Sequence, residues 1–172
     1  MMIAVRSEAG PGATLAALHR EHYRSLVKLA SILVDDRDAC EEIVQDAFVS
    51  VFRSTSRVRD DAKLPAYLRS AVLNGARSHL RKRQVRSHFR VVGGPGLAVS
   101  AEAAALLADE QHALLEALRA LPDRQHDVLI LRFYLDLSES EIAETLGIAP
   151  GTVKTHTRRG LDALNEALEN RR

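Results

Sequence analysis

The stretch that decides the fold is Leu137–Leu168, LSESEIAETLGIAPGTVKTHTRRGLDALNEAL. Ser138 is a good N-cap residue, and Glu141 three positions later completes the pattern of a capping box at the start of a helix. Gly147 follows the last apolar residue of that helix, where a left-handed residue commonly ends one. Pro150 suits the first turn of a second helix, because its missing N–H needs no partner there. The stretch therefore predicts two helices joined by a short glycine turn, which is the pattern of a helix-turn-helix.

The second of these helices is predicted to be basic on the outside and apolar on the inside. Polar and basic side chains on its leading turns are of the types that contact base edges and phosphates. This segment taken alone also fits an ordinary helical hairpin with a solvated basic face. The expected core positions are Val153, Leu161 and Leu164. The candidate contacts with duplex DNA are Thr152, Lys154, Thr155, His156, Arg158 and Arg159.

The composition favours a helical protein with few aromatic residues. Of the 172 residues 46% are hydrophobic and 4% aromatic, with no tryptophan, so Leu, Val, Ile and Ala must build the core. Such a composition favours helices. A single cysteine excludes an intramolecular disulfide and argues against a cysteine-based zinc site. The sequence has no apolar run that fits a signal peptide or a membrane span, so we expect a cytoplasmic protein.

Apolar residues recur at helical spacing along most of the chain, and no segment alternates as a strand does. Val91–Ala101 contains three glycines and a proline and is typical of a linker. We therefore expect an all-α protein of two small helical domains, at residues 13–88 and 105–170, joined by a linker at 89–104. The helices are predicted at residues 15–34, 39–52, 65–86, 102–118, 122–133, 139–146 and 150–170.

Within the first three predicted helices, we expect one residue to act as an N-cap and a set of apolar residues to be buried in the core. Asp38 is the expected N-cap of the second helix, and residues 53–64 are expected to form a loop because they lack an apolar period. The expected buried positions are Leu26, Leu29, Ala30, Leu33, Ile43, Val44, Ala47, Phe48, Val51, Phe52, Leu68, Val72, Ala76 and Leu80.

The end of the third predicted helix, Arg77–Arg90, carries six lysine or arginine residues and no acid. Like charges at this density repel one another along a helix, and a phosphate backbone relieves that repulsion and releases counterions. Complementing a helix C-terminus needs only about two or three cations, so nucleic acid is the favoured partner. The candidate contacts here include Arg77, Arg81, Lys82 and Arg83.

The second predicted helix carries an acidic face made by Glu41, Glu42, Gln45 and Asp46. The spacing of Glu42 and Asp46 places two carboxylates side by side. A catalytic role would need a cleft and perturbed pKa values, which a sequence does not show. Spacing alone fits a solvated face and a docking patch for a basic partner equally well.

The sequence shows no sign of an enzyme. His19 and His22 lie one helical turn apart, but no third ligand sits near them and the HExxH spacing of a zinc hydrolase is absent. Cys40 occupies a small-residue position and is expected to pack. There is no glycine-rich phosphate loop, nucleophile elbow or carboxylate–histidine cluster. We therefore expect no catalytic residues, no metal site and no cofactor.

Over about residues 15–168, the chain resembles the extracytoplasmic-function (ECF) sigma factors of bacterial RNA polymerase. Three segments carry the resemblance, and they follow one another in the order that the family has. EEIVQDAFVSVF at 41–52 is similar to region 2.2 of that family, and PAYLRSAVLNGARSHLRKR at 65–83 is similar to regions 2.3 and 2.4. Residues 118–164 are similar to region 4. The resemblance implies a region 2 helical bundle joined to a region 4 helix-turn-helix domain.

The resemblance also implies a role for each candidate surface and a set of partners. Core RNA polymerase would be bound through its β′ clamp helices and its β flap, and promoter DNA would be single-stranded at −10 and duplex at −35. The residues implied for core polymerase are Glu41, Glu42, Gln45 and Asp46. Those implied for the −10 element are Tyr67, Asn74, Arg77, Arg81, Lys82 and Arg83. Those implied for the −35 element are Thr152, Lys154, Thr155, His156, Arg158 and Arg159.

Two positions depart from the family pattern. Tyr67 is followed by Leu68 where the family often has an aromatic pair, so base stacking rests on one ring. Ala149 stands where the family usually has a serine before the helix that meets the −35 element. Losing that capping oxygen typically costs about 1 kcal/mol.

The resemblance thus implies a subunit that directs core polymerase to promoters, melts them and starts transcription. Relatives are often held by an anti-sigma factor, which makes such a protein a candidate partner. An alternative is a stand-alone helix-turn-helix regulator, which would bind a palindromic duplex as a dimer without polymerase. A metal-dependent hydrolase using His19 and His22 is a third class, and it predicts stoichiometric bound metal.

Overall fold

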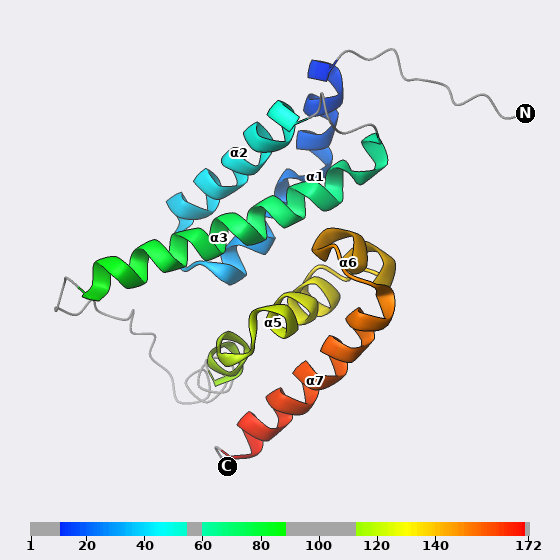
Figure 1. Cartoon of the computed structure of the whole chain (residues 1–172). Helices are drawn as coiled ribbons and strands as arrows, with labels where there is room; N and C mark the ends of the chain where they lie inside the picture. Colours follow the sequence, from blue (N-terminus) through cyan, green and yellow to red (C-terminus); the bar gives the residue numbers. More distant parts are fainter. Residues whose placement is uncertain (1–10, 55–59, 89–112, 171–172) are drawn as a thin grey trace, which may run out of the picture. The chain divides into compact units, whose positions relative to one another are not determined.

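The chain is helical nearly throughout the part that its structure describes. A computed structural model describes the backbone of residues 11–54, 60–88 and 113–170, and these residues contain no strand, so the all-α prediction is confirmed. Two compact units are distinguished, Met1–Lys82 and Arg83–Arg172 (Figure 1). Residues 113–120 are helical. The other helices are α1 Pro11–Leu33, α2 Arg37–Ser54, the 3-10 helix η1 Asp61–Lys63, α3 Leu64–His88, α5 Asp123–Leu129, the π-helical turn η2 Ile130–Tyr134, α6 Glu139–Leu146 and α7 Pro150–Glu169.

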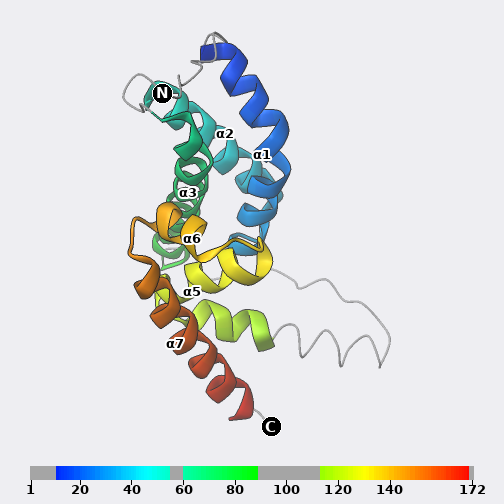
Figure 2. The ribbon, with the colours of Figure 1, turned by 90° about the vertical axis from the view of Figure 1, so that its right-hand side faces the viewer.

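In the first unit α1 and α2 pack side by side (Figure 2). The ring of His19 on α1 stacks on Tyr23 with centroids 4.6 Å apart, and it lies 5.0 Å from the ring of Phe48 on α2. Leu26 and Leu29 of α1 are fully buried, as predicted. Burying one leucine side chain contributes about 1.5–3 kcal/mol, so these two residues add substantially to the stability of the first unit.

The second helix begins two residues earlier than the sequence predicts. α2 starts at Arg37, and the Asp38 N–H donates a hydrogen bond of 3.0 Å to Asp36 Oδ1. The prediction that Asp38 caps this helix is therefore wrong, because Asp36 supplies the capping oxygen. Neighbouring aspartates fit the capping pattern equally well, and the path of the chain leaving α1 decides between them.

α3 approaches α2 closely at Gly75. A Cβ on Gly75 would lie 3.0 Å from Ile43 Cγ2, so the missing side chain lets the two helices come together. Leu68, Val72 and Ala76 of α3 are buried, as predicted. Ile43 and Gly75 both line the groove described below.

Two positions that were expected to be buried in this unit are exposed. Phe52 near the end of α2 is 44% exposed, and Leu80 in the second half of α3 is 38% exposed. Helical periodicity gives the direction of a side chain, but not the length over which a neighbouring helix covers it. The loop expected at residues 53–64 is also partly wrong, because α2 continues to Ser54 and η1 begins at Asp61.

The helix-turn-helix of the second unit has the local features that the sequence predicts. The Glu141 N–H donates to Ser138 Oγ at 3.3 Å, and the Ser138 N–H donates to the Glu141 carboxylate at 2.9 Å, which completes the capping box of α6. Gly147 adopts a left-handed conformation with φ 63° and ψ 38°, and its N–H donates to the Ala143 carbonyl. This turn ends α6 and redirects the chain, so that α7 begins at Pro150.

α7 runs beside α5 and approaches it closely at Gly160 (Figures 1 and 2). A Cβ on Gly160 would lie 2.9 Å from Leu129 Cδ1. Val153 and Leu164 of α7 are buried, as predicted, but Leu161 is 39% exposed. The prediction for Leu161 is wrong because Gly160 faces α5, and the next residue on a helix points about 100° away.

Some predicted features lie outside the described residues. They are the linker at 89–104, the first part of the helix expected at 102–118, and the segment before residue 11. α5 begins at Asp123 with Pro122 at its N-cap, one residue from the predicted start. No helix in the described part of the chain has the length and apolar character that crossing a membrane requires.

Candidate functional site

The basic face predicted for α7 lies at the surface. The helix starts from Ala149, which is extended and makes no side-chain cap hydrogen bond, and Pro150 stands in its first turn. No acid occupies that first turn, so the start of α7 presents cations and hydroxyls without opposing charge on the same helix. Such a surface suits phosphates and base edges. The exposed side chains are Thr152, Lys154, Thr155, Arg158 and Arg159.

His156, the sixth predicted DNA contact on α7, differs from the other five because it is half-buried. Its Nδ1 atom is buried without a hydrogen-bond partner among the described residues. Thr155 Oγ1 donates at 3.1 Å to the Gly151 carbonyl, which is a hydrogen bond within the helix. His156 is therefore partly a packing group, and the Thr155 hydroxyl must exchange a local hydrogen bond for any contact with DNA.

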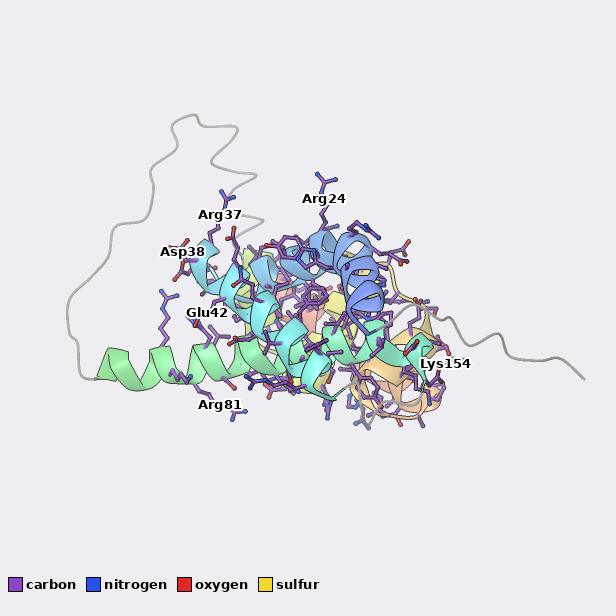
Figure 3. The ribbon with its side chains drawn as sticks, turned by 90° about the horizontal axis from the view of Figure 1, so that it is seen from above. Arg24, Arg37, Asp38, Glu42, Arg81 and Lys154 are labelled. Atoms are coloured by element: carbon purple, nitrogen blue, oxygen red, sulfur yellow. The ribbon has the colours of Figure 1, made fainter. Side chains whose placement is uncertain are left out.

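Lys154 is paired with an acid from the other helix of the motif. Its Nζ lies 3.6 Å from Glu139 Oε2 in the first turn of α6. Figure 3 labels Lys154, whose side chain lies at the surface. Sequence reasoning missed Glu139, because the spacing along the chain does not show that the start of α6 reaches the start of α7.

The predicted acidic face lies on α2. Glu42, Gln45 and Asp46 are exposed, and Glu42 is labelled in Figure 3. Glu41 is less exposed, and its Oε1 lies 3.5 Å from Arg37 Nε one turn earlier. Within the predicted face, Glu42 and Asp46 therefore present two exposed carboxylates one turn apart.

A groove of about 660 Å³ opens between α2 and α3. Glu42 and Asp46 line it from α2, while Tyr67, Asn74 and Lys82 line it from α3. The structure thus brings together two sets of candidate residues that the sequence treats separately. Sequence reasoning missed the part that small and polar side chains play in this groove. The remaining lining residues are Ile43, Ala47, Ser50, Val51, Ser70, Ala71, Gly75, Ser78 and His79.

The α3 residues predicted to bind DNA lie along one helix. Tyr67 is 48% exposed, so about half of this residue is accessible at the surface. Asn74 Oδ1 accepts a hydrogen bond of 3.4 Å from Arg77 Nη1, which ties the amide of the groove to a guanidinium one turn later. Further along the same helix the exposed cations are Arg81, Lys82 and Arg83.

The two histidines considered as metal ligands have other neighbours. His19 stacks on aromatic rings, and His22 Nε2 lies 3.9 Å from the Glu21 carboxylate. Within the described residues no group of three His, Cys, Asp or Glu side chains is placed to hold a metal ion. Cys40 is buried, and that burial, together with the nearby charge of Asp36, raises the pKa of its thiol. The described residues therefore give the hydrolase hypothesis no support.

Comparison with known proteins gives two matches in the order of the two units. The family model for Sigma-70 region 2 matches residues 18–86, and that for Sigma-70 region 4 matches residues 111–164. The chain is 30% identical over 156 residues to the RNA polymerase sigma-E factor of Streptomyces avermitilis, covering 88% of this chain and 83% of that protein. It is 28% identical over 141 residues to the ECF RNA polymerase sigma factor SigW of Bacillus subtilis, covering 76% and 75%.

The chain belongs to the ECF sigma factors of RNA polymerase. The recognition made from the residues is confirmed, and with it the function: this sigma factor directs transcription initiation. Sigma factors bind core RNA polymerase and promoter DNA, and the family is not one of enzymes. The matches give no support to the alternative of a stand-alone helix-turn-helix regulator.

Solved structures show the same fold. The chain resembles CnrH, solved in complex with the cytosolic domain of CnrY, with a TM-score of 0.66 and 22% identity, covering 91% of this chain and 88% of that chain. It also resembles the sigma factor RpoE from Bartonella quintana, solved with the anti-sigma factor NepR, with a TM-score of 0.60 and 23% identity, covering 91% and 99%. The fold of this sigma factor is therefore that of solved sigma factors.

Proposed function

We propose that this sigma factor divides promoter recognition among three surfaces. The acidic face of α2 binds the β′ clamp helices of core polymerase, the α3 side of the groove holds the melted −10 strand, and α7 reads the −35 duplex. The observation that carries the proposal is the groove between α2 and α3, because its two walls have different chemistry and belong to the first two surfaces.

The α2 wall suits a basic protein partner. Glu42 and Asp46 present two exposed carboxylates one turn apart. Carboxylates repel the phosphates of nucleic acid, whereas opposite charges on a protein partner speed association and fix the register of binding. We therefore assign this face to core polymerase and not to DNA. The assigned residues are Glu41, Glu42, Gln45 and Asp46.

The α3 wall suits an unpaired DNA strand. Stacking of a base on an aromatic ring is worth about 1–3 kcal/mol, and the exposed ring of Tyr67 offers one such platform. Flipping a base costs a few kcal/mol, which stacking and the amide of Asn74 together offset. The cations further along α3 then contact the backbone. The assigned residues are Tyr67, Asn74, Arg77, Arg81, Lys82 and Arg83.

α7 suits the major groove of duplex DNA. It is the second helix of a helix-turn-helix and carries exposed cations on its second and third turns, within the N-terminal part where such helices contact bases and phosphates. Binding of free duplex by the chain alone should be weak and strongly dependent on salt. The assigned residues are Thr152, Lys154, Thr155, His156, Arg158 and Arg159.

We further propose that the domains span residues 13–88 and 105–170, with a linker at 89–104 that threads toward the active-site channel of the polymerase. Support comes from the two family matches, at 18–86 and 111–164, which leave this linker unmatched. We expect the chain to act in the cytoplasm, where core polymerase is found, and to contribute no catalytic site, metal site or cofactor of its own.

An anti-sigma factor is proposed as a regulatory partner. The support is that a sigma factor of the same fold, RpoE from Bartonella quintana, is solved bound to the anti-sigma factor NepR. A true inhibitor of this chain must form a complex with it and abolish its binding to core polymerase. A complex that leaves transcription unchanged would argue against such regulation.

The first test is transcription in vitro with purified core polymerase and genomic fragments, with and without the full chain. We expect discrete start sites that appear only with the chain, preceded by two shared promoter elements. Tyr67→Ala should reduce strand opening, measured by permanganate oxidation of unpaired thymines, while binding to core polymerase is retained. Opening that survives in Tyr67→Ala and Asn74→Ala would remove the α3 wall from the proposal.

A further inference from the structure

One cation of α7 is already paired with an acid in the absence of DNA. Lys154 Nζ lies 3.6 Å from Glu139 Oε2, and the two residues come from the two helices of the motif. The lysine side chain is 68% exposed and the glutamate 37%, and ion pairs this exposed add little to stability because water screens them. Any role of the pair therefore lies in where it places the two charges, and not in the stability of the fold.

The pair restricts where the ammonium of Lys154 lies. A lysine carries its charge on a flexible stem, so an unpaired one contacts phosphates and base acceptors with little discrimination. Glu139 is an acceptor in the first turn of α6, a turn that the Ser138–Glu141 capping box fixes. At 3.6 Å the two groups form an ion pair, and the three N–H donors of the ammonium can still be directed to another acceptor.

The charge of Glu139 also opposes contact with the DNA backbone. A carboxylate beside the ammonium repels phosphate oxygens and reduces the net positive charge that a phosphate meets. Base edges carry no net charge, and a guanine offers two acceptors, O6 and N7, in the major groove. Pairing with Glu139 thus favours a base over a phosphate as the acceptor for Lys154.

We propose that Glu139 is a positioning residue for promoter recognition, which holds Lys154 so that this lysine reads one base pair of the −35 element instead of the phosphate backbone. The inference rests on the proposed assignment of α7 to the −35 duplex. In this proposal Glu139 of α6 makes no contact with DNA itself, but it sets the specificity of Lys154, which does.

The test uses a library of promoters randomised across the −35 element and transcribed by core polymerase reconstituted with the full chain. Sequencing of the transcripts gives the preference at each base pair. The variants are Glu139→Gln, Lys154→Ala and the double variant. Glu144→Gln is the matched control, because it removes the same charge from an exposed position of α6 that points about 140° away from Glu139.

The wild type and Glu144→Gln should share one preferred base pair that depends on Lys154, favoured roughly fivefold or more. Glu139→Gln should lose most of that preference while its total transcription is maintained. Its duplex binding should depend more steeply on salt, by about 0.9 in the logarithmic slope, because one more lysine then engages a phosphate. In the Lys154→Ala background, Glu139→Gln should have no further effect.

The outcomes separate this inference from the assignment on which it rests. If Lys154→Ala loses the preference and Glu139→Gln keeps it, the positioning role is wrong and the assignment of α7 stands. If Lys154→Ala also keeps the preference, Lys154 does not read the −35 element, and both the positioning role and the assignment of Lys154 fail. Thermal unfolding of each variant should match the wild type, so that an altered preference cannot come from a damaged fold.

Discussion

Gly160 of α7 faces Leu129 of α5 so closely that a Cβ on the glycine would lie 2.9 Å from Leu129 Cδ1 and 3.1 Å from its Cγ. Both residues are buried. A glycine inside a helix costs about 1 kcal/mol relative to alanine, so its presence here needs a local reason. The reason is the close approach of the two helices, which sets where α7 and its exposed face lie within the second unit.

Gly160→Val should therefore destabilise the second unit by about 1–3 kcal/mol, because the added atoms overlap the Leu129 side chain in a packed core. Each kcal/mol corresponds to roughly 4–8 °C in the unfolding midpoint of a domain of this size. Thermal unfolding of the full chain measures the shift. The matched control is Gly151→Val on the same helix, where a Cβ meets nothing within 4 Å. Equal shifts in the two variants would contradict the packing argument.

Gly147→Ala should cost about 1 kcal/mol for a different reason. A Cβ at Gly147 meets no neighbour within 4 Å, but the residue has φ +63°, a conformation that is strained for every residue with a Cβ. The expected result is a lower unfolding midpoint with unchanged packing elsewhere. Gly151→Ala, at an open position with ordinary helical geometry, should instead leave stability equal or slightly higher. A neutral Gly147→Ala would mean that the turn relaxes to another conformation.

Ala149→Ser should stabilise α7 by about 1 kcal/mol. Ala149 has the extended backbone of an N-cap, with φ −71° and ψ 147°, but no side-chain oxygen. A serine there would accept a hydrogen bond from an N–H of the first turn. Thermal unfolding measures the gain, and Ala149→Val, which adds side-chain atoms without an acceptor, serves as the control. No gain from serine would show that solvent already satisfies these donors.

Glu42→Lys should weaken binding to core polymerase by at least about tenfold, because it reverses a charge on the proposed docking face. The fold should survive, since the side chain is exposed. Binding is measured by titrating labelled chain with core polymerase. Glu21→Lys makes the same charge reversal at an exposed position of α1, outside the proposed face, and should bind as the wild type does. Parallel losses in both variants would point to net charge instead of a docking site.

Cys40 should react with thiol reagents about a hundredfold or more slowly in the native chain than in denaturant. Burial and nearby acids raise the pKa of this thiol, and access requires opening a core whose stability is on the order of 5 kcal/mol. A Ser31→Cys variant that also carries Cys40→Ala places the thiol on the surface and should react fast in both conditions.

The same raised pKa gives a pH dependence of stability with a definite sign. The folded state favours the neutral thiol, so this contribution is fully present below the ordinary thiol pKa of about 8.5 and is lost as pH rises through the raised value. The free energy of unfolding should therefore fall in this alkaline range, and it should fall less in Cys40→Ala. Equal slopes in the two proteins would show that the thiol does not contribute.

Local features of this protein were predictable from short stretches of its sequence. The capping box of Ser138 and Glu141, the left-handed Gly147 and the start of α7 at Pro150 all depend on residues within a few positions of one another. The sequence also contains segments similar to regions 2 and 4 of sigma factors in the order of that family, and this order led to the family that the comparisons show.

Burial was less predictable where a helix extends beyond the helix that packs against it. Phe52, Leu80 and Leu161 lie on apolar stripes yet are exposed, while Gly160 is buried beside one of them. Periodicity reports the face of a helix, whereas exposure depends on the length and direction of the helix that packs against it. The choice of Asp36 over Asp38 as the cap of α2 has the same origin, since it depends on how the chain leaves α1.

The sequence by itself thus determined most of the helices, the capping box of α6, the glycine turn and the membership of a family, because each depends on neighbouring residues or on the order of segments along the chain. Only the tertiary structure decided that Glu42 and Asp46 share a groove with Tyr67 and Asn74, and that Glu139 reaches Lys154. Contacts between helices depend on packing across space, which spacing along a chain does not encode.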